Sequence, residues 1–300
     1  RMWKALNPLK YPGSQYAKRD VIGDTAVINN FTYDALRDYY KKWYGPDNQA
    51  IIVVGDIDVD QIEAKIKALW AEVPARENRG ERPLYSVDDN AEPIVAIVRD
   101  KEAQYTRIEM EFKKDQLAKE LRGTNKSYIL SIVRELICDM LNNRFSELAM
   151  KPEATFVAAG SYYGELVKEK DAFTAVYLTK QGQETQAYAD LLLQLEGMRR
   201  YGFTNAELER VKKETIAAYE KSYNERNTMR NIAYVQEYIN NYLSGEPIPG
   251  IEWEYTAIQQ LLPAIDINLI NQYAHTCVTD SNLIISFQAP DYPNITLPTE

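Results

Sequence analysis

Histidine is almost absent from this sequence, which has only His275 among its 300 residues. A catalytic zinc site takes about three ligands from histidine, cysteine and carboxylate side chains, and most nucleophilic triads take their base from histidine. His275 has no Glu or second His at helical spacing, and Cys277 would face away from it on a helix. The sequence therefore predicts no catalytic residues and no metal ligands, and it also lacks the Gly-rich loops that cradle phosphates.

Cysteine, long apolar runs and excess positive charge are scarce as well. The two cysteines, Cys138 and Cys277, do not make a disulfide framework. No window approaches the roughly 18 consecutive apolar residues of a membrane-spanning helix, so we expect no membrane span. The formal net charge of −9 argues against nucleic acid as a partner, because a phosphate backbone binds to a basic face. What remains is the composition of a globular protein, 45% hydrophobic and 26% charged.

The best-defined stretch of the sequence, residues 31–70, predicts a helix, a tight turn, a buried strand and a second helix. Thr32 is a good N-cap, and the apolar residues after it recur on one helical face. The turn GPDN at 45–48 stops this helix, because proline cannot continue it. The β-branched run IIVV at 51–54 has the length of a buried strand, and Asp58 begins a capping box for the next helix.

Part of this stretch, YYKKWYGPDNQAIIVVGDID, resembles the insulinase/pitrilysin zinc peptidases, whose inverted H-x-x-E-H motif binds zinc. The similarity continues upstream in YPGSQYAKRDVIG, residues 11–23, and far downstream in YTAIQQLLPAIDINLINQYA, residues 255–274. The motif itself is absent, and the family's additional glutamate ligand would fall before Arg1. The resemblance therefore implies a non-catalytic portion of a zinc metalloendopeptidase, inactive alone, with no cofactor in this chain and zinc in the parent protein.

The order of elements predicts an α+β fold with internal repetition. Residues 76–92 are charged and contain proline, which is typical of a linker. We expect residues 1–75 to be the back half of a first peptidase-like domain and residues 93–300 to be a second, non-catalytic one. The last part of the chain repeats the opening unit at an offset of 234 residues, with Asp266 in the place of Thr32.

The expected fold is a mixed, mainly antiparallel sheet, or sheets, packed with helices, in repeated metallohydrolase-like domains of the LuxS/mitochondrial processing peptidase-like type. Strands are predicted near 94–98, 105–112, 154–163, 172–179 and 283–287, and helices near 126–150, 183–200, 205–223 and 228–242. In the second strand Glu109 and Glu111 share the polar face, and we expect both carboxylates to be solvated.

One predicted strand, ATFVAAGSYYG at 154–164, has small side chains that would let another backbone approach closely. In insulinase relatives the equivalent part of the second domain holds an edge strand that pairs with bound peptide, and strand addition needs only main-chain donors and acceptors. The resemblance thus implies seven peptide-holding residues: Phe156, Val157, Ala158, Ala159, Gly160, Ser161 and Tyr162. An internal strand under a helix would show the same small residues, so the sequence leaves both placements open.

Three hypotheses for function remain open at this point. The first is a wall of the peptidase chamber that helps to hold unfolded peptide, with the rest of the parent peptidase as partner. The second is an inactive scaffold subunit that binds a separate catalytic subunit, as in mitochondrial processing peptidase, and the third is an unrelated α+β module. The strand at 50–54 would lack its usual sheet neighbours in a half-domain, which predicts self-association as a homodimer or a poorly ordered first third. The resemblance favours the bacterial periplasm over the cytoplasm.

Overall fold

The computed structural model describes residues 1–74 and 83–298 and divides into two compact units. Unit 1 consists of Arg1–Asp20, Leu84–Glu220 and Tyr255–Glu300, and unit 2 consists of Val21–Pro83 and Lys221–Glu254. Residues 76–82 of the predicted linker lie outside the described residues. The predicted division into 1–75, 76–92 and 93–300 describes domains related by duplication. The two compact units do not test such a division, so it stays a prediction.

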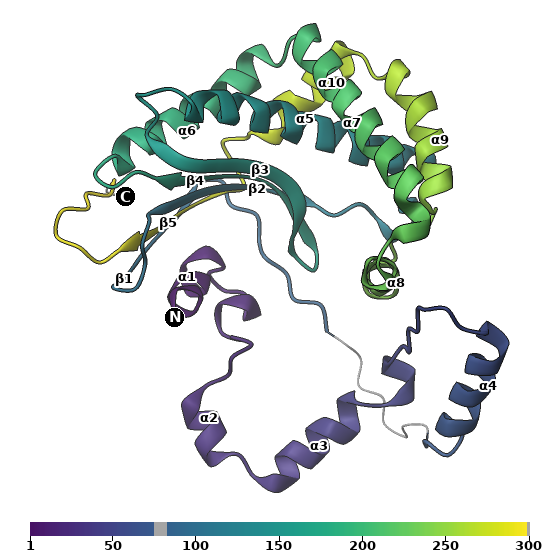
Figure 1. The fold of residues 1–300 in the computed structure, drawn as a ribbon. Helices are drawn as coiled ribbons and strands as arrows, with labels where there is room; N and C mark the ends of the chain where they lie inside the picture. Colours follow the sequence, from purple (N-terminus) through teal and green to yellow (C-terminus); the bar gives the residue numbers. More distant parts are fainter. Residues whose placement is uncertain (75–82, 299–300) are drawn as a thin grey trace. The chain divides into compact units, whose positions relative to one another are not determined.

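Unit 1 is built on a five-stranded sheet with the strand order β1-β5-β2-β4-β3 (Figure 1). The strands are β1 (Ile94–Asp100), β2 (Arg107–Asp115), β3 (Phe156–Val167), β4 (Lys170–Thr179) and β5 (Leu283–Pro290). β1 pairs with β5 in parallel, and the other three pairings are antiparallel. The prediction of a mixed, mainly antiparallel sheet packed with helices in an α+β fold is confirmed.

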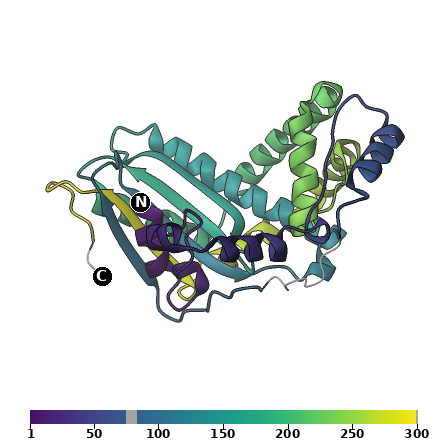
Figure 2. The same cartoon turned by 90° about the horizontal axis from the view of Figure 1, so that it is seen from below.

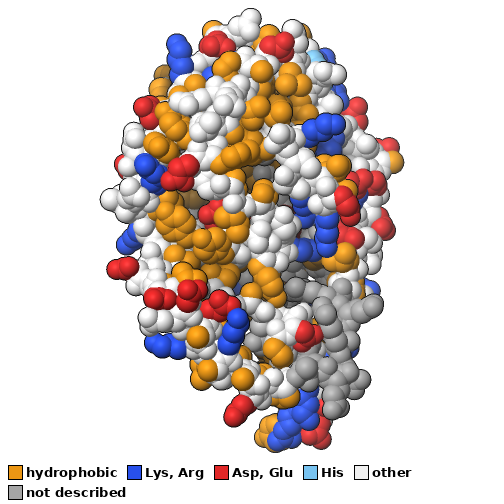
Figure 3. All heavy atoms as spheres, turned by 90° about the vertical axis from the view of Figure 1, so that its right-hand side faces the viewer, with side chains coloured by type: hydrophobic (Ala, Val, Ile, Leu, Met, Phe, Trp, Pro, Cys, Tyr) orange, Lys and Arg blue, Asp and Glu red, His pale blue; other side chains and the backbone are white. Residues whose placement is uncertain are grey.

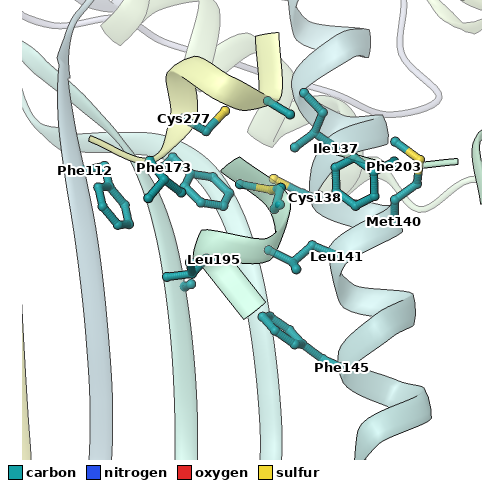
Figure 4. Close-up of a cluster of buried hydrophobic side chains, with 14 of the residues drawn as sticks. Phe112, Ile137, Cys138, Met140, Leu141, Phe145, Phe173, Leu195, Phe203 and Cys277 are labelled. Carbon is teal, nitrogen blue, oxygen red and sulfur yellow. The ribbon is translucent and has the colours of Figure 1, made fainter. Parts of the chain in front are cut away.

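A layer of helices covers one face of this sheet. It contains α5 (Asn125–Ala149), α6 (Glu184–Tyr201), α10 (Ile267–Cys277) and the unit 1 portions of α7 (Asn205–Glu225) and α9 (Ile251–Leu261). Alternation along β2 points Ile108, Met110 and Phe112 into this layer, where all three are buried. Figure 4 shows the resulting core between the sheet and α5, and each fully buried large apolar side chain contributes about 1.5–3 kcal/mol.

The opposite face of the sheet is partly covered by α1 (Met2–Lys10), as Figures 1 and 2 show. Leu6 is fully buried there against Ala96 and Val98 of β1. The described residues also form short 3₁₀ helices: η1 (Gln15–Ala17), η2 (Pro46–Asn48), η3 (Lys119–Leu121), η4 (Arg226–Thr228) and η5 (Leu262–Ala264). Because of α1, the first twenty residues belong to the same compact unit as the sheet.

Unit 2 is helical and has no fully buried residue in its complete α-helices, which are α2 (Thr25–Asn30), α3 (Tyr33–Trp43), α4 (Val59–Trp70) and α8 (Asn231–Ser244). The predicted caps of α3 and α4 are confirmed, since Thr32 accepts from the Ala35 N–H and Asp58 from the Gln61 N–H. The buried strand predicted at 51–54 is wrong, because no described residue pairs with it and Ile51 is 47% exposed. A strand needs a neighbouring strand, and local propensity cannot replace one.

The predicted internal repeat appears in two helices with matching ends. α3 and α10 are both 11 residues long, and their first residues, Tyr33 and Ile267, are 234 positions apart. Each begins with the same type of cap, since Asp266 accepts from the Leu269 N–H at 2.8 Å as Thr32 does from Ala35 at 3.2 Å. The chain after α10 forms β5, which lies between β1 and β2.

Candidate functional site

The seven candidate residues from Phe156 to Tyr162 lie in β3, which is an edge strand of the sheet. Its one strand neighbour among the described residues is β4, with Ser161 opposite Ala175. The placement that the sequence left open is therefore at an edge and not inside the sheet. Peptide binding by these residues stays a prediction.

The hydrogen bonds of Asn142, on α5, show which main-chain groups of β3 face away from β4. Its Oδ1 accepts from the Ser161 N–H at 2.6 Å, and its Nδ2 donates to the Ser161 carbonyl oxygen at 3.1 Å. Both groups of Ser161 thus face outward, and by alternation those of Ala159 and Tyr163 do so too. Within the described part of the chain no hydrogen bond reaches the outward groups of Ala159 or Tyr163.

The β3 edge also lacks charged side chains over most of its length. No charged residue occurs from Phe156 to Gly164, whereas the opposite edge strand, β1, carries Arg99 and Asp100. A Cβ atom built on Gly160 or on Gly164 would meet nothing within 4 Å. Proteins normally protect exposed strand edges with charges, prolines or bulges, and between its register shifts at Phe156/Ala158 and Glu165/Val167 this strand has no charge or proline up to Gly164, which suits a second backbone.

A cavity of about 290 Å³ opens beside this strand on the face that α1 partly covers. Its lining comes from α1, β2, β3 and β4 and includes two ion pairs, of which the one between Lys10 and Glu111 is buried. Lys10 Nζ lies 2.5 Å from Glu111 Oε2, and Arg107 lies 2.7 Å from Glu109 Oε1. Burial raises the pKa of Glu111, although the charge of Lys10 opposes that rise. The Tyr162 hydroxyl donates to Glu109 over 3.4 Å.

The expectation that Glu109 and Glu111 are solvated is wrong, since they are only 3% and 4% exposed. Alternation along β2 correctly places Glu109 and Glu111 on the face opposite the apolar residues. It does not show which element of the fold covers that face. That element is α1, about a hundred positions upstream. Each carboxylate has a cationic partner, Lys10 for Glu111 and Arg107 for Glu109.

Zinc does not fit the described residues. In residues 1–74 and 83–298 no group of three or more His, Cys, Asp or Glu side chains could hold a metal ion. His275 lies in the last turn of α10, where its Nδ1 contacts the Arg199 carbonyl oxygen. Burial raises the pKa of the Cys138 and Cys277 thiols to about 12, so neither is a thiolate near neutral pH. Among the helices described, none is long and apolar enough to cross a membrane.

Sequence reasoning missed Asn142, the residue that contacts the edge most directly. One signal was available, because asparagine is a poor helix former and Asn142 and Asn143 stand together inside a 25-residue helix. Such a residue often makes a specific side-chain hydrogen bond, but the sequence does not show with which strand.

The described residues thus combine a helix-covered mixed sheet of the α+β class with an edge strand at β3. A family described as "Peptidase M16 inactive domain" matches residues 30–215. The chain belongs to this family, as the resemblance to the insulinase/pitrilysin peptidases implied.

Two relatives show how much of a longer protein the chain represents. The chain is 24% identical over 291 residues to "Zinc protease PQQL-like" of Arabidopsis thaliana, covering 97% of the chain and 27% of that protein. It is 26% identical over 236 residues to "Probable zinc protease PqqL" of Haemophilus influenzae, covering 78% and 25%. The chain thus spans about a quarter of the length of the curated relatives it matches.

The fold recurs in solved structures of similar proteins. The crystal structure of the first half of the periplasmic protease PqqL from Escherichia coli has a TM-score of 0.83 and 18% identity, covering 96% of this chain and 61% of that one. A peptidase M16 inactive domain from Pseudomonas fluorescens has a TM-score of 0.69 and 14% identity, covering 98% and 66%. At these identities the likeness shows the fold alone.

Proposed function

We propose that this chain is the non-catalytic portion of a zinc metallopeptidase and that its β3 edge holds peptide substrate by strand addition. The observation that carries the proposal is the edge position of β3, with no charged residue at 156–164 and with outward main-chain groups at Ala159 and Tyr163. Main-chain pairing tolerates many peptide sequences, which suits a protein that holds unfolded chains. The cavity beside Tyr162 would receive side chains of the added strand.

The catalytic zinc would be held by the rest of the parent protein. Relatives named as zinc proteases are more than three times as long as this chain, and the residues described here supply no ligand set for the metal. In this proposal the chain forms part of the chamber wall. The name of the similar E. coli protein, a periplasmic protease, supports the periplasm as the compartment.

The partner of unit 2 would be the remaining half of the parent peptidase. The helices of unit 2 leave large apolar side chains exposed, among them Leu36, Tyr39 and Tyr40, each more than half exposed. Apolar side chains also reach the surface between the charged ones in Figure 3. An inactive scaffold subunit remains the alternative, because the same faces would serve a separate catalytic subunit. Co-purification with a second, motif-bearing chain would favour that alternative.

Strand addition is tested by the binding of a labelled, Lys-capped peptide of alternating Thr and Val to the 300-residue chain. A copy of the peptide with N-methyl groups on alternate residues cannot donate along one edge. We expect the unmodified peptide to bind and the methylated copy to bind at least about tenfold more weakly, which corresponds to about 1.4 kcal/mol. Equal binding of the two peptides would contradict main-chain pairing.

The position of the added strand is tested with Ala159→Pro. This substitution removes an outward N–H without removing a hydrogen bond to β4, and the preceding residue is already extended. Ala159→Ser keeps the N–H and serves as the matched control. We expect the proline variant to lose peptide affinity while the serine variant keeps it.

A further inference from the structure

The side chain of Asn142 imitates one peptide unit of a sixth strand at the β3 edge. A carboxamide has the same donor and acceptor as a main-chain amide, and this one bonds both the N–H and the carbonyl oxygen of Ser161. Asn142 Oδ1 also accepts from the Ser161 hydroxyl at 3.0 Å, and that hydroxyl lies 3.3 Å from the Cys138 carbonyl oxygen. The contact therefore occupies the outward main-chain groups of Ser161, which lies near the middle of β3.

The Asn142 side chain bonds the outward main-chain groups of Ser161 and leaves those of the neighbouring outward residues without a partner among the described residues. Ala159 and Tyr163, on either side, have outward groups to which no described residue donates or accepts. Asn142 is only half-buried, so a rotation of its side chain would carry the amide into solvent without moving α5. Ser161 itself is 5% exposed, so water replaces the lost hydrogen bonds poorly.

We propose that Asn142 is an autoinhibitory cover of the peptide-binding edge. It closes the edge at Ser161 in the free protein and divides it into two short segments, one at Ala159 and one at Tyr163. A peptide that pairs along the whole edge must displace the Asn142 amide and take over its two hydrogen bonds. This inference rests on the proposed strand addition at β3, and it adds how access to that edge is limited.

The energetic consequence has a definite sign. In the native chain the peptide exchanges two existing hydrogen bonds at Ser161 for two new ones, so that position contributes little to affinity. With Asn142→Ala the free protein leaves those groups unpaired, and the peptide gains both hydrogen bonds. Removing the cover should therefore tighten peptide binding by about tenfold. Alanine is also the better helix former, so α5 tolerates the change.

The test measures binding of the labelled, Lys-capped Thr-Val peptide to the native 300-residue chain, Asn142→Ala and Asn143→Ala. Asn143 is the matched control, because it neighbours Asn142 on α5 but contacts Glu214 instead of β3. Circular dichroism of each variant checks that it is folded. Binding that is about tenfold tighter in Asn142→Ala alone, or that is measurable in Asn142→Ala alone, supports the proposal.

Asn142→Asp is the second variant, in case the alanine variant does not fold. Its carboxylate still accepts from the Ser161 N–H but cannot donate to the carbonyl oxygen, so we expect an affinity gain of about threefold. Unchanged or weaker binding in the folded variants, with measurable binding to the native chain, overturns the role of Asn142 and leaves strand addition intact. Absence of binding to every variant overturns strand addition at β3 and this inference together.

Discussion

Leu36 and Ile270 hold the same place in two helices of equal length 234 positions apart, yet Leu36 is 55% exposed and Ile270 is fully buried. α10, which carries Ile270, is followed by β5, a strand with neighbours on both sides. α3, which carries Leu36, is followed by residues 51–54, which pair with no described strand. The helices arise from local sequence, whereas burial depends on the sheet that each helix can cover.

The first prediction concerns the exposed face of α3. Double substitution Leu36→Glu and Tyr40→Glu should weaken self-association of the chain, because burying each such side chain contributes about 1.5–3 kcal/mol to association. Sedimentation velocity should show a shift toward monomer. Asp38→Asn, a change on the same helix that adds no negative charge, should leave association unchanged. A native chain that is strictly monomeric, with slowly exchanging amides in unit 2, would contradict the prediction.

The second prediction concerns the ion pair between Lys10 and Glu111, whose side chains are almost completely buried. Lys10→Met leaves a buried carboxylate without its partner and should lower the free energy of unfolding by about 3–5 kcal/mol. Adding Glu111→Gln removes that charge and should recover most of the loss. Urea unfolding measures both variants, with the exposed Lys4→Met in the same helix as the control. Equal stability of the single and double variants would show that the pair is uncoupled.

The third prediction is the pH dependence of the same pair. Burial raises the pKa of Glu111 above its unfolded value, so the folded state binds the proton more tightly. Its contribution to stability is then full below the unfolded pKa and is lost as pH rises through the folded pKa. Lys10→Met removes the charge that opposes this rise, so the variant should lose up to about 1.4 kcal/mol per pH unit relative to its stability near pH 5. A slope no steeper than that of the native chain would contradict this.

Much of the fold could be predicted from the sequence because local signals specify it. The caps at Thr32 and Asp266 and the strand alternation through β2 all depend on neighbouring residues. The buried state of Glu109 and the contact of Asn142 with Ser161 could not be predicted, because each depends on a residue or element distant in the chain. The candidate edge came from the family resemblance, and its position at the end of the sheet required the strand order.

The fourth prediction concerns zinc. The described residues offer no cluster of metal ligands, so zinc chloride should not raise the melting temperature of the 300-residue chain. A ligand that binds only the folded state stabilises it by RT ln(1 + [L]/Kd), about 2.7 kcal/mol at a hundredfold excess over Kd. Calorimetry with zinc and with a chelator therefore gives a sensitive comparison. A zinc-dependent rise accompanied by peptide cleavage would overturn the non-catalytic assignment.

The fifth prediction concerns Arg134, which holds the β3 edge strand from α5. Its guanidinium carbon lies 3.8 Å from the centre of the Tyr163 ring, and its Nε donates to the Tyr273 hydroxyl at 2.7 Å. Arg134→Lys keeps the positive charge but loses the planar guanidinium that stacks on the Tyr163 ring while it donates to the Tyr273 hydroxyl. The substitution should lower the free energy of unfolding by about 1 kcal/mol. Hydrogen exchange should then quicken in β3 more than in the central strand β5. Arg200→Lys, on the exposed side of α6, is the control, and equal acceleration in both strands would mean that Arg134 supports the whole sheet and not its edge.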